Sequence, residues 1–510
     1  MADFSGYTWV VVLGTIVCFI SAFGMGANDV ANAFGTSVGA NAISMRNAMV
    51  IAGIFEFAGA FLMGSSVTST IQSKICDPMA FQEDPEMLMF GMLCVIVGVA
   101  AWLIIATMYS LPVSTTHSCI GGLVGMTIVA KGAHAVKWAS VGGVVASWFV
   151  SPVLSGLITC LLFWIVRKYV LRVKDSFNRA FHFYPLLIGF TLFVLSLFML
   201  LKGIPGLSST LNPWLATLIS LVFGGICALI LTFTVVPCLK KRIEAQRRAD
   251  QEAVKAESGP VVIDVVKKEV ELPVISNKPT EEKPAEEKPA EEKPVEKKEV
   301  TVETPKEKNT MLHQNIHAEL ADEKSVVYQL HQRAEKFDPY TERVFSYLQV
   351  ITATLNAFAH GANDVANSIG PLASIVAIYK SGAVSKSPDV EPWILVLGGA
   401  GIVVGLACLG YKVMAAIGVN MVTVTSSRGF AIEVGSAFVI VAGSQLGLPL
   451  STTHCQVGST VGVGLMEGKN SVNWKLVWQV FFGWVITLLV CSVTTGALFA
   501  FAVYAPSKSV

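Results

Sequence analysis

Long apolar stretches separated by short polar breaks run along most of this chain. A membrane-spanning helix needs roughly 20 apolar residues, and lipid offers the backbone no hydrogen bonds, so each such stretch is expected to be helical. The pattern predicts an all-α polytopic membrane protein with about 12 transmembrane segments. The predicted helical stretches are 7–24 with 27–42, 46–70, 88–110, 112–130, 138–166, 184–202, 214–238, 344–359 with 361–379, 392–412, 429–447, 449–466 and 474–504.

Composition supports a membrane location. Of the 510 residues, 53% are hydrophobic and 14% charged, whereas soluble domains carry about 25% charged residues. The lipid bilayer is therefore the expected surrounding, and the net charge of +1 gives no reason to expect a nucleic-acid partner. The ten cysteines are scattered singly through apolar stretches, which favours small buried hydrophobic residues over metal ligands, and no cofactor is expected.

One block of the chain differs from the rest. Residues 241–340 contain the repeat EEKPAEEKPAEEKPV, a composition that cannot bury enough apolar surface to fold. We expect a disordered tether, with a regulatory role left open. Lysine and arginine in 167–174 and 239–248 lie on one side of the predicted spans, and such residues favour the cytoplasm. The linker is therefore expected inside and the N-terminus outside.

Two motifs occur twice in the same order. GANDVANAFG at 26–35 returns 335 residues later as GANDVANSIG, and LPVSTTHSCIGGLVG at 111–125 returns 337 residues later as LPLSTTHCQVGSTVG. Chance does not produce two such pairs, so the sequence indicates an internal duplication. With the expected orientation the two copies are inverted, an arrangement typical of secondary transporters, whose sites lie near the membrane midplane. The predicted parts are repeat 1 at 1–168, an inserted helix pair at 169–240, the linker at 241–340 and repeat 2 at 341–510.

The first motif offers oxygen ligands inside an apolar stretch. Its glycines are expected to let the backbone leave helical geometry, and unwound backbone with carboxylate and amide oxygens suits a small hard cation. The alternative is that the asparagines only join neighbouring helices by hydrogen bonds. The predicted cation-binding residues are Asn28, Asp29, Asn32, Asn363, Asp364 and Asn367.

The second motif predicts a helix start. Proline followed by hydroxyl residues is typical of a capped helix N-terminus, where free N–H groups bind anions. Two such starts, reaching in from opposite sides, are expected to hold one tetrahedral anion; plain helix capping is the alternative. His117 and His454 are expected to make orienting hydrogen bonds rather than to act as metal ligands or bases. The predicted anion-binding residues are Ser114, Thr115, Thr116, Ser451, Thr452 and Thr453.

Charge types link the two motifs. In a medium of low dielectric constant, Asp29 and Asp364 would repel an anion unless cations neutralise them. The cation must therefore bind with the anion, which predicts obligatory symport. The residues alone do not distinguish sodium from a proton.

Further ionisable residues stand in apolar surroundings. Glu56 and Glu433 are functional candidates because acids inside a membrane are costly, although Glu433 alternatively pairs with Arg428. His360 precedes only the second copy of the first motif. These residues are candidates for a role in transport.

The four motif instances resemble the duplicated signatures of the inorganic phosphate transporter (PiT) family, which includes sodium–phosphate symporters. The resemblance covers both apolar halves and not the linker. It implies phosphate and sodium as substrates, uptake across the plasma membrane, an inverted-repeat fold with outward termini, and a homodimer. It also implies that the motif aspartates and asparagines serve sodium, that the Ser-Thr-Thr runs bind phosphate, and that Glu56 and Glu433 matter for transport.

Other functions remain open at this point. A proton-coupled carrier, a carrier of another oxyanion, and a phosphate sensor that binds without transport all fit the motifs. A hydrolase using Ser114 and His117 is disfavoured, because that pair lacks a third orienting acid and an enzyme has no need of a second copy. We therefore expect a transporter and not an enzyme.

Overall fold

The computed structural model describes residues 4–75, 77–203, 211–257, 316–385, 388–445 and 450–504. Within them the chain is helical and contains no strand. Eight of the described helices are long and apolar enough to cross a membrane. These observations confirm an all-α fold with several candidate spans, while the number of 12 segments stays a prediction.

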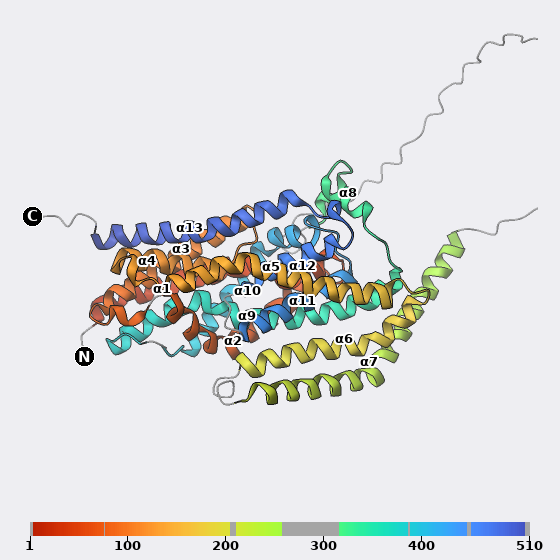
Figure 1. Ribbon diagram of the computed structural model, residues 1–510, viewed down its shortest axis with the longest axis horizontal. Helices are drawn as coiled ribbons and strands as arrows, with labels where there is room; N and C mark the ends of the chain where they lie inside the picture. The colour runs from red at the N-terminus through yellow and green to blue at the C-terminus, as the bar shows by residue number, and fades with distance from the viewer. Residues whose placement is uncertain are drawn as a thin grey trace, which may run out of the picture. The chain divides into compact units, whose positions relative to one another are not determined.

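The helices form two series of the same order in one compact unit (Figure 1). The first series is α1 (Thr8–Gly39), α2 (Met45–Ile75), α3 (Pro85–Met108), α4 (Thr115–Lys131) and α5 (Trp138–Val166). The second is α9 (Pro339–Ser381), α10 (Pro392–Ala415), α11 (Ser426–Gln445), α12 (Thr452–Leu465) and α13 (Trp474–Tyr504). Between them lie α6 (Ser176–Phe198), α7 (Pro213–Glu257) and α8 (Val326–Arg333).

The helices of the first series pack mainly against helices of the second series. Helix α1 packs along α10 as α9 packs along α2, and α4 packs along α13 as α12 packs along α5. Each of these pairs joins one half of the chain to the other. The main contacts thus recur with the two halves exchanged.

Helices α1 and α9 run unbroken through the first motif, so the predicted interruptions near residues 25 and 360 are wrong. The motif glycines instead allow close packing. A Cβ atom at Gly26 would lie 1.9 Å from the carbonyl oxygen of Ile402, and one at Gly361 would lie 2.2 Å from that of Glu56. Small residues let helix backbones approach in this way inside membranes.

The Ser-Thr-Thr runs lie at the tips of two helical hairpins, α3–α4 and α11–α12. The open ends are held by ion pairs, Lys131 with Asp84 at 2.6 Å in the first hairpin and Arg428 with Glu467 in the second. Both tips are inside the bundle, because Ser114 and Ser451 are each only 2% exposed. The hairpins therefore carry polar residues from the ends of the bundle to its centre.

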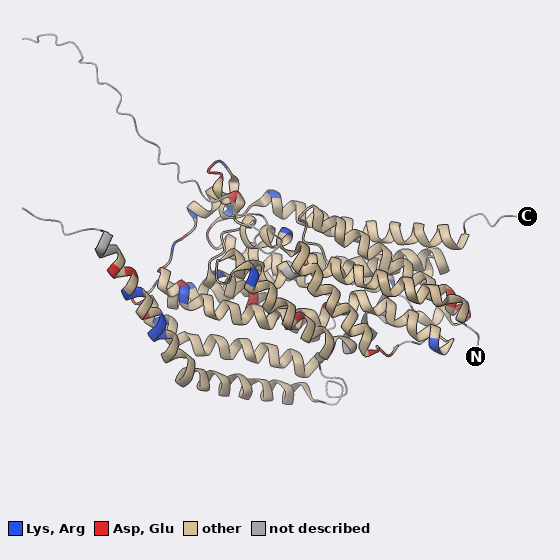
Figure 2. Ribbon diagram, turned by 180° about the vertical axis from the view of Figure 1, so that it is seen from behind, with Lys and Arg blue, Asp and Glu red and all other residues tan. Residues whose placement is uncertain are grey.

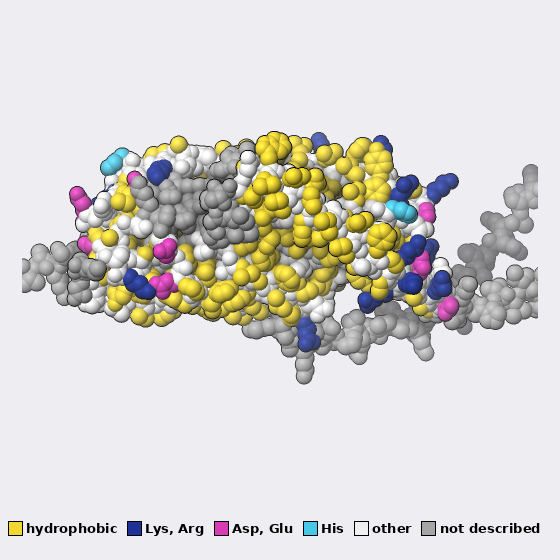
Figure 3. Space-filling model, turned by 90° about the horizontal axis from the view of Figure 1, so that it is seen from below, with side chains coloured by type: hydrophobic (Ala, Val, Ile, Leu, Met, Phe, Trp, Pro, Cys, Tyr) yellow, Lys and Arg dark blue, Asp and Glu magenta, His cyan; other side chains and the backbone are white. Residues whose placement is uncertain are grey.

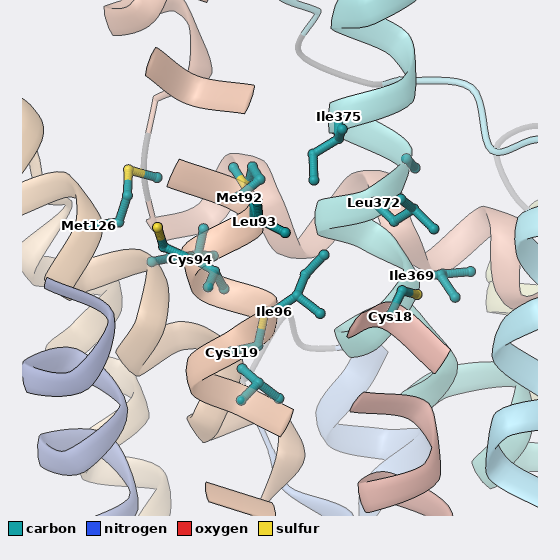
Figure 4. Packing of buried hydrophobic residues seen from close by; sticks show 14 of the residues in the cluster. Cys18, Met92, Leu93, Cys94, Ile96, Cys119, Met126, Ile369, Leu372 and Ile375 are labelled. Carbon is teal, nitrogen blue, oxygen red and sulfur yellow. The ribbon is translucent and has the colours of Figure 1, made fainter. Parts of the chain in front are cut away.

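An apolar core fills the space between α3, α4 and α9 (Figure 4). Ile96 of α3 faces Leu372 and Ile375 of α9, and Cys119 of α4 packs on the other side. The described cysteines are free of disulfides. Charged residues stand mostly at the ends of the helices (Figure 2). The middle of the bundle thus suits a lipid surrounding.

Most of the predicted linker, residues 258–315, lies outside the described residues. Its two ends are ordered. Helix α7 continues to Glu257, because the sequence after Pro237 is rich in Lys, Glu, Ala, Gln and Arg, which favour helix. Helix α8 and the start of α9, capped by Ser325 and Asp338, follow the undescribed part. The predicted boundaries at 241 and 340 therefore fall inside helices.

Replacing Gly405 with alanine tests the close packing of α1 on α10. Its Cβ would lie 1.8 Å from the carbonyl oxygen of Phe23, so we expect Gly405→Ala to lower the free energy of unfolding by roughly 1–3 kcal/mol. Gly225→Ala is the control, since nothing lies within 4 Å of that Cβ position. Thermal unfolding in detergent micelles would show the difference. Equal melting temperatures for the two variants would contradict the packing argument.

Candidate functional site

Polar side chains from both halves meet at the buried centre of the bundle. Asn32 of α1 donates from Nδ2 to Thr453 Oγ1 of α12 at 3.0 Å. Asn367 of α9 donates from Nδ2 to Thr116 Oγ1 of α4 at 3.1 Å. Asn32 matches Asn367 in the duplicated motifs, and Thr116 matches Thr453. The second hydrogen bond is therefore the equivalent of the first, with the two halves exchanged. The structure thus brings the two motifs together.

The two motif aspartates share a histidine. His360 Nε2 lies 2.9 Å from Asp364 Oδ2 and 3.9 Å from Asp29 Oδ2. Hairpin hydroxyls also reach these acids: Thr452 donates to Asp364 Oδ2 at 3.1 Å, and Thr453 donates to Asp29 Oδ1 at 3.5 Å. Both aspartates are 1% exposed, so water does not stabilise their charges. Protein groups or bound ions must do so.

A third acid lies on the other side of the same histidine. The two carboxylate oxygens of Glu56 lie 2.9 and 2.8 Å from His360 Nδ1. Three carboxyl groups thus surround one imidazole ring, an excess of acids over bases. Such a buried excess is balanced by bound cations or by protons.

Several oxygens at the centre are free to bind such a cation. Among the described residues, Asp29 Oδ2, Asn32 Oδ1 and Asn367 Oδ1 are buried without a hydrogen-bond partner. Ligand atoms of Asp29, His360 and Asp364 all lie within 4.8 Å of one another. Pro371 has no N–H to bond the carbonyl of Asn367 in α9. Carboxylate, amide and carbonyl oxygens are the ligands that hard cations prefer.

The other two motif asparagines have different partners. Asn28 Oδ1 accepts a hydrogen bond from the Val113 N–H at 3.0 Å, and its Nδ2 donates to Thr107 and to the carbonyl of Leu111. It therefore anchors the turn of the first hairpin rather than facing the acids. Asn363 Nδ2 donates to Asp364 Oδ1 at 2.8 Å.

The starts of α4 and α12 offer donors to an anion. Ser114 caps α4, accepting from the His117 N–H at 3.3 Å. Ser451 stands at the matching place before α12 but makes no capping bond, and its buried Oγ has no partner among the described residues. Free N–H groups at a helix start, with hydroxyls beside them, bind oxyanions.

The paired histidines contact each other. The rings of His117 and His454 lie 4.7 Å apart, edge to face, and His454 also packs on Trp484. Neither ring nitrogen of His117 has a hydrogen-bond partner among the described residues, whereas His454 interacts with the backbone of Ser147. The expected orienting role of the two histidines stays a prediction. The contact between the rings holds the two helix starts together.

Glu433 of α11 belongs to a neighbouring polar cluster. Its carboxylate accepts hydrogen bonds from Thr36 at 2.7 Å, Ser37 at 2.8 Å and Gln349 at 3.3 Å, and also from Thr352. Helices α1 and α9 supply all these donors. Glu433 is therefore held by neutral groups and not by a cationic side chain.

Arg428 lies away from this cluster. It pairs with Glu467 and bonds the carbonyl of Glu335 at the mouth of the second hairpin. The alternative in which Glu433 pairs with Arg428 is therefore not what the structure shows. The two residues are five positions apart along α11, about 1.4 turns, and the arginine side chain extends toward Glu467 at the end of the hairpin.

A cavity of about 50 Å³ connects the two polar clusters. Its polar wall includes Thr352, Asn356, His360 and Glu433, and α6 closes the opposite wall with apolar side chains such as Phe198. Sequence reasoning missed Gln349, Thr352 and Asn356. The sequence signal that could have found them is a polar stripe along one face of α9. Its polar residues are spaced three or four positions apart, at 349, 352, 356, 360, 363 and 367.

Comparisons with known proteins agree on one family. The sequence model of the phosphate transporter family matches residues 25–495. The phosphate-repressible phosphate permease pho-4 of Neurospora crassa is 32% identical over 580 residues, with 98% of each chain covered. Sodium-dependent phosphate transporter 1-A of Danio rerio is 29% identical, with 98% of this chain and 96% of that one covered. A solved structure titled "The sodium-dependent phosphate transporter" superposes with a TM-score of 0.71 at 29% identity, covering 97% of this chain and 99% of that chain.

The pairing of His360 with Glu56 can be tested against the other half of the chain, where Met25 and Ile402 stand at the matching places. We expect His360→Met or Glu56→Ile alone to destabilise the protein by about 3–5 kcal/mol, because each leaves a buried polar partner uncompensated. The double variant removes both groups and should recover most of the loss. A double-mutant cycle from thermal unfolding measures this coupling.

Met25→Leu controls for a change of packing in the same layer, and should cost less than about 1.5 kcal/mol. Additive losses in the His360→Met, Glu56→Ile double variant would mean that the two side chains are not an energetically coupled pair.

Proposed function

Since this chain belongs to the phosphate transporter family, we propose that it is a symporter that imports inorganic phosphate with sodium across the plasma membrane by alternating access. The observation that carries the proposal is the buried excess of carboxyl groups beside two helix starts rich in hydroxyl residues, of which Ser451 has a buried Oγ without a hydrogen-bond partner among the described residues. A cation site and an anion site in contact make binding of the two ions interdependent.

Sodium is assigned to the centre of the bundle. Asp29, Asp364, Asn32 and Asn367 supply the oxygens, and the three nearby carboxylates favour cations over water. Sodium binding neutralises the site before phosphate arrives. Glu56 and His360 set the charge that remains to be balanced.

Phosphate is assigned to the hairpin tips. The residues 114–116 and 451–453 stand at two helix starts that are joined by the contact between His117 and His454 and by the hydrogen bond from Thr453 Oγ1 to the Val113 carbonyl at 3.2 Å. Their bonds to Asn32 and Asn367 join the anion site to the sodium ligands. Neutral donors hold an oxyanion loosely enough to release it again.

The hairpins are proposed to enter and leave the membrane on the same side. Helices α4 and α12 have 17 and 14 residues, or roughly 26 and 21 Å, less than the bilayer core of about 30 Å. Lys131 with Asp84, and Arg428 with Glu467, hold both ends of each hairpin together. This supports two re-entrant hairpins that meet at the midplane.

Alternating access is supported by a difference between the halves. The cavity lies beside Glu433 of α11, whereas the matching residue of α3, Ile96, lies in the apolar core shown in Figure 4. One side of the site therefore holds a polar cavity, while the matching place on the other side is filled by apolar side chains. Exchange of these arrangements would expose the site to the opposite side.

The proposed orientation has both termini outside and the linker inside. The start of α1 and the end of α13 lie at one end of the bundle (Figure 1). Lysine and arginine gather at the other end (Figure 3), as expected for a cytoplasmic face. A homodimer is proposed on the resemblance of the motifs to the phosphate transporter family.

Uptake of labelled phosphate into proteoliposomes tests the function. An inward sodium gradient should drive accumulation, and a proton gradient alone should not. Asp29→Asn should reduce sodium-driven uptake at least about tenfold, the effect of losing some 1.4 kcal/mol of cation binding. Asp77→Asn, the same change at an exposed loop residue, should transport normally.

The outcomes separate the competing functions. Uptake driven only by a proton gradient would show that the coupling ion is a proton and not sodium. Phosphate binding without uptake under either gradient would identify a sensor. Competition by sulfate as effective as that by phosphate would show a broader oxyanion carrier.

A further inference from the structure

A π-helical turn ends helix α5. Residues Arg167–Leu171 form this turn, and the Arg172 N–H donates to the Arg167 carbonyl at 3.0 Å. In an α-helix, residues five apart point to different sides, but a π turn places them nearly above one another. Arg167 and Arg172 therefore extend on the same side of the chain.

A carboxylate shows what this pair of arginines binds. The Nε atoms of Arg167 and Arg172 each lie 2.8 Å from an oxygen of Glu335, which precedes α9. Partial burial raises the pKa of Glu335, but hydrogen bonds from Arg172 and Arg167 outweigh it and lower the pKa overall. Two guanidinium groups on one oxyanion is an arrangement that also suits phosphate.

A pocket of about 360 Å³ lies beside this pair, lined by Trp164, Arg167, Lys168 and Arg172. Lys168 Nζ lies 4.8 Å from the centre of the Trp164 ring, and within the described part of the chain no carboxylate pairs with it. Arg172 is 55% exposed at its side chain. Three cations and one carboxylate leave the pocket with a net charge of +2.

The position of the pocket favours a lipid over a free ion. Trp164 and Tyr169 are half-exposed and follow an apolar face of α5 that exposes Val153, Leu157 and Leu161. Exposed aromatic rings at the end of an apolar helix mark the depth of the lipid headgroups. Basic pockets at this depth on a cytoplasmic side bind phosphorylated headgroups.

We propose that this pocket binds the phosphorylated headgroup of an anionic membrane phospholipid. Its phosphates contact Lys168 and Arg172, and its acyl chains lie along the exposed face of α5. Glu335 competes for the same arginines, so the lipid and the segment before α9 are antagonists at this site. The site is separate from the transport centre and does not depend on sodium or phosphate transport.

Binding can be measured on the purified full-length protein in nanodiscs. The probe is a fluorescent phosphatidylinositol bisphosphate, with phosphatidylcholine as the neutral lipid. Lys168→Ala should weaken binding about fivefold, and Glu335→Gln should tighten it about fivefold, since one charge near the membrane surface is worth about 1 kcal/mol. Opposite effects of two single variants do not arise from misfolding.

Lys475→Ala is the matched control, because Lys475 is exposed beside Trp474 at the start of α13. Equal losses in Lys168→Ala and Lys475→Ala would overturn the proposal in favour of unspecific attraction. Displacement of the lipid by millimolar inorganic phosphate, but not by the soluble inositol phosphate headgroup, would assign the pocket to free phosphate and would also overturn it. Displacement by the soluble headgroup alone is expected.

Discussion

Three carboxylates held around one histidine in the centre of an apolar bundle constrain the rest of the structure. Asp29, Asp364 and Glu56 are almost fully buried, and such charges persist only where partners or ions balance them. His360 places one ring nitrogen against Asp364 and the other against Glu56, hairpin hydroxyls supply donors, and several oxygens are left for cations. The re-entrant path proposed for the hairpins serves this need, because it brings donors to the acids without bringing lysine or arginine.

The two halves share a framework but differ in how polar they are. The main helix contacts recur with the halves exchanged, yet the pair His360 and Glu56 stands where the other half has Met25 and Ile402. Glu433, with its hydroxyl donors, stands where the other half has Ile96 in the apolar core. Each polar residue thus packs with polar partners, while the equivalent place, found by exchanging the two halves, is apolar. The cavity lies on the polar side.

The sequence predicted the helices and the motif residues that meet, because apolar length and duplicated polar motifs are local signals. The predictions from the sequence failed where contacts with a helix from the other half of the chain determine the local structure. The glycines beside the motif favoured a break, but Gly26 and Gly361 pack against backbone from the other half. Asn28 binds the turn of the first hairpin through the Val113 N–H, a contact far along the chain that the motif itself does not indicate. The linker end Glu335 reaches arginines of α5, which no spacing in the sequence indicates.

The placement of full charges explains how an anion can be held and then released. Ion pairs close the hairpin mouths at the ends of the bundle, whereas the described residues lining the cavity include no lysine or arginine. An oxyanion at the hairpin tips would therefore receive only neutral hydrogen bonds and the field of nearby cations. In the proposed mechanism those cations bind at Asp29 and Asp364, so their departure would restore the repulsion and weaken anion binding in the same step. Under that proposal, release on the side of lower sodium concentration would follow from this electrostatic dependence, without a separate device for phosphate.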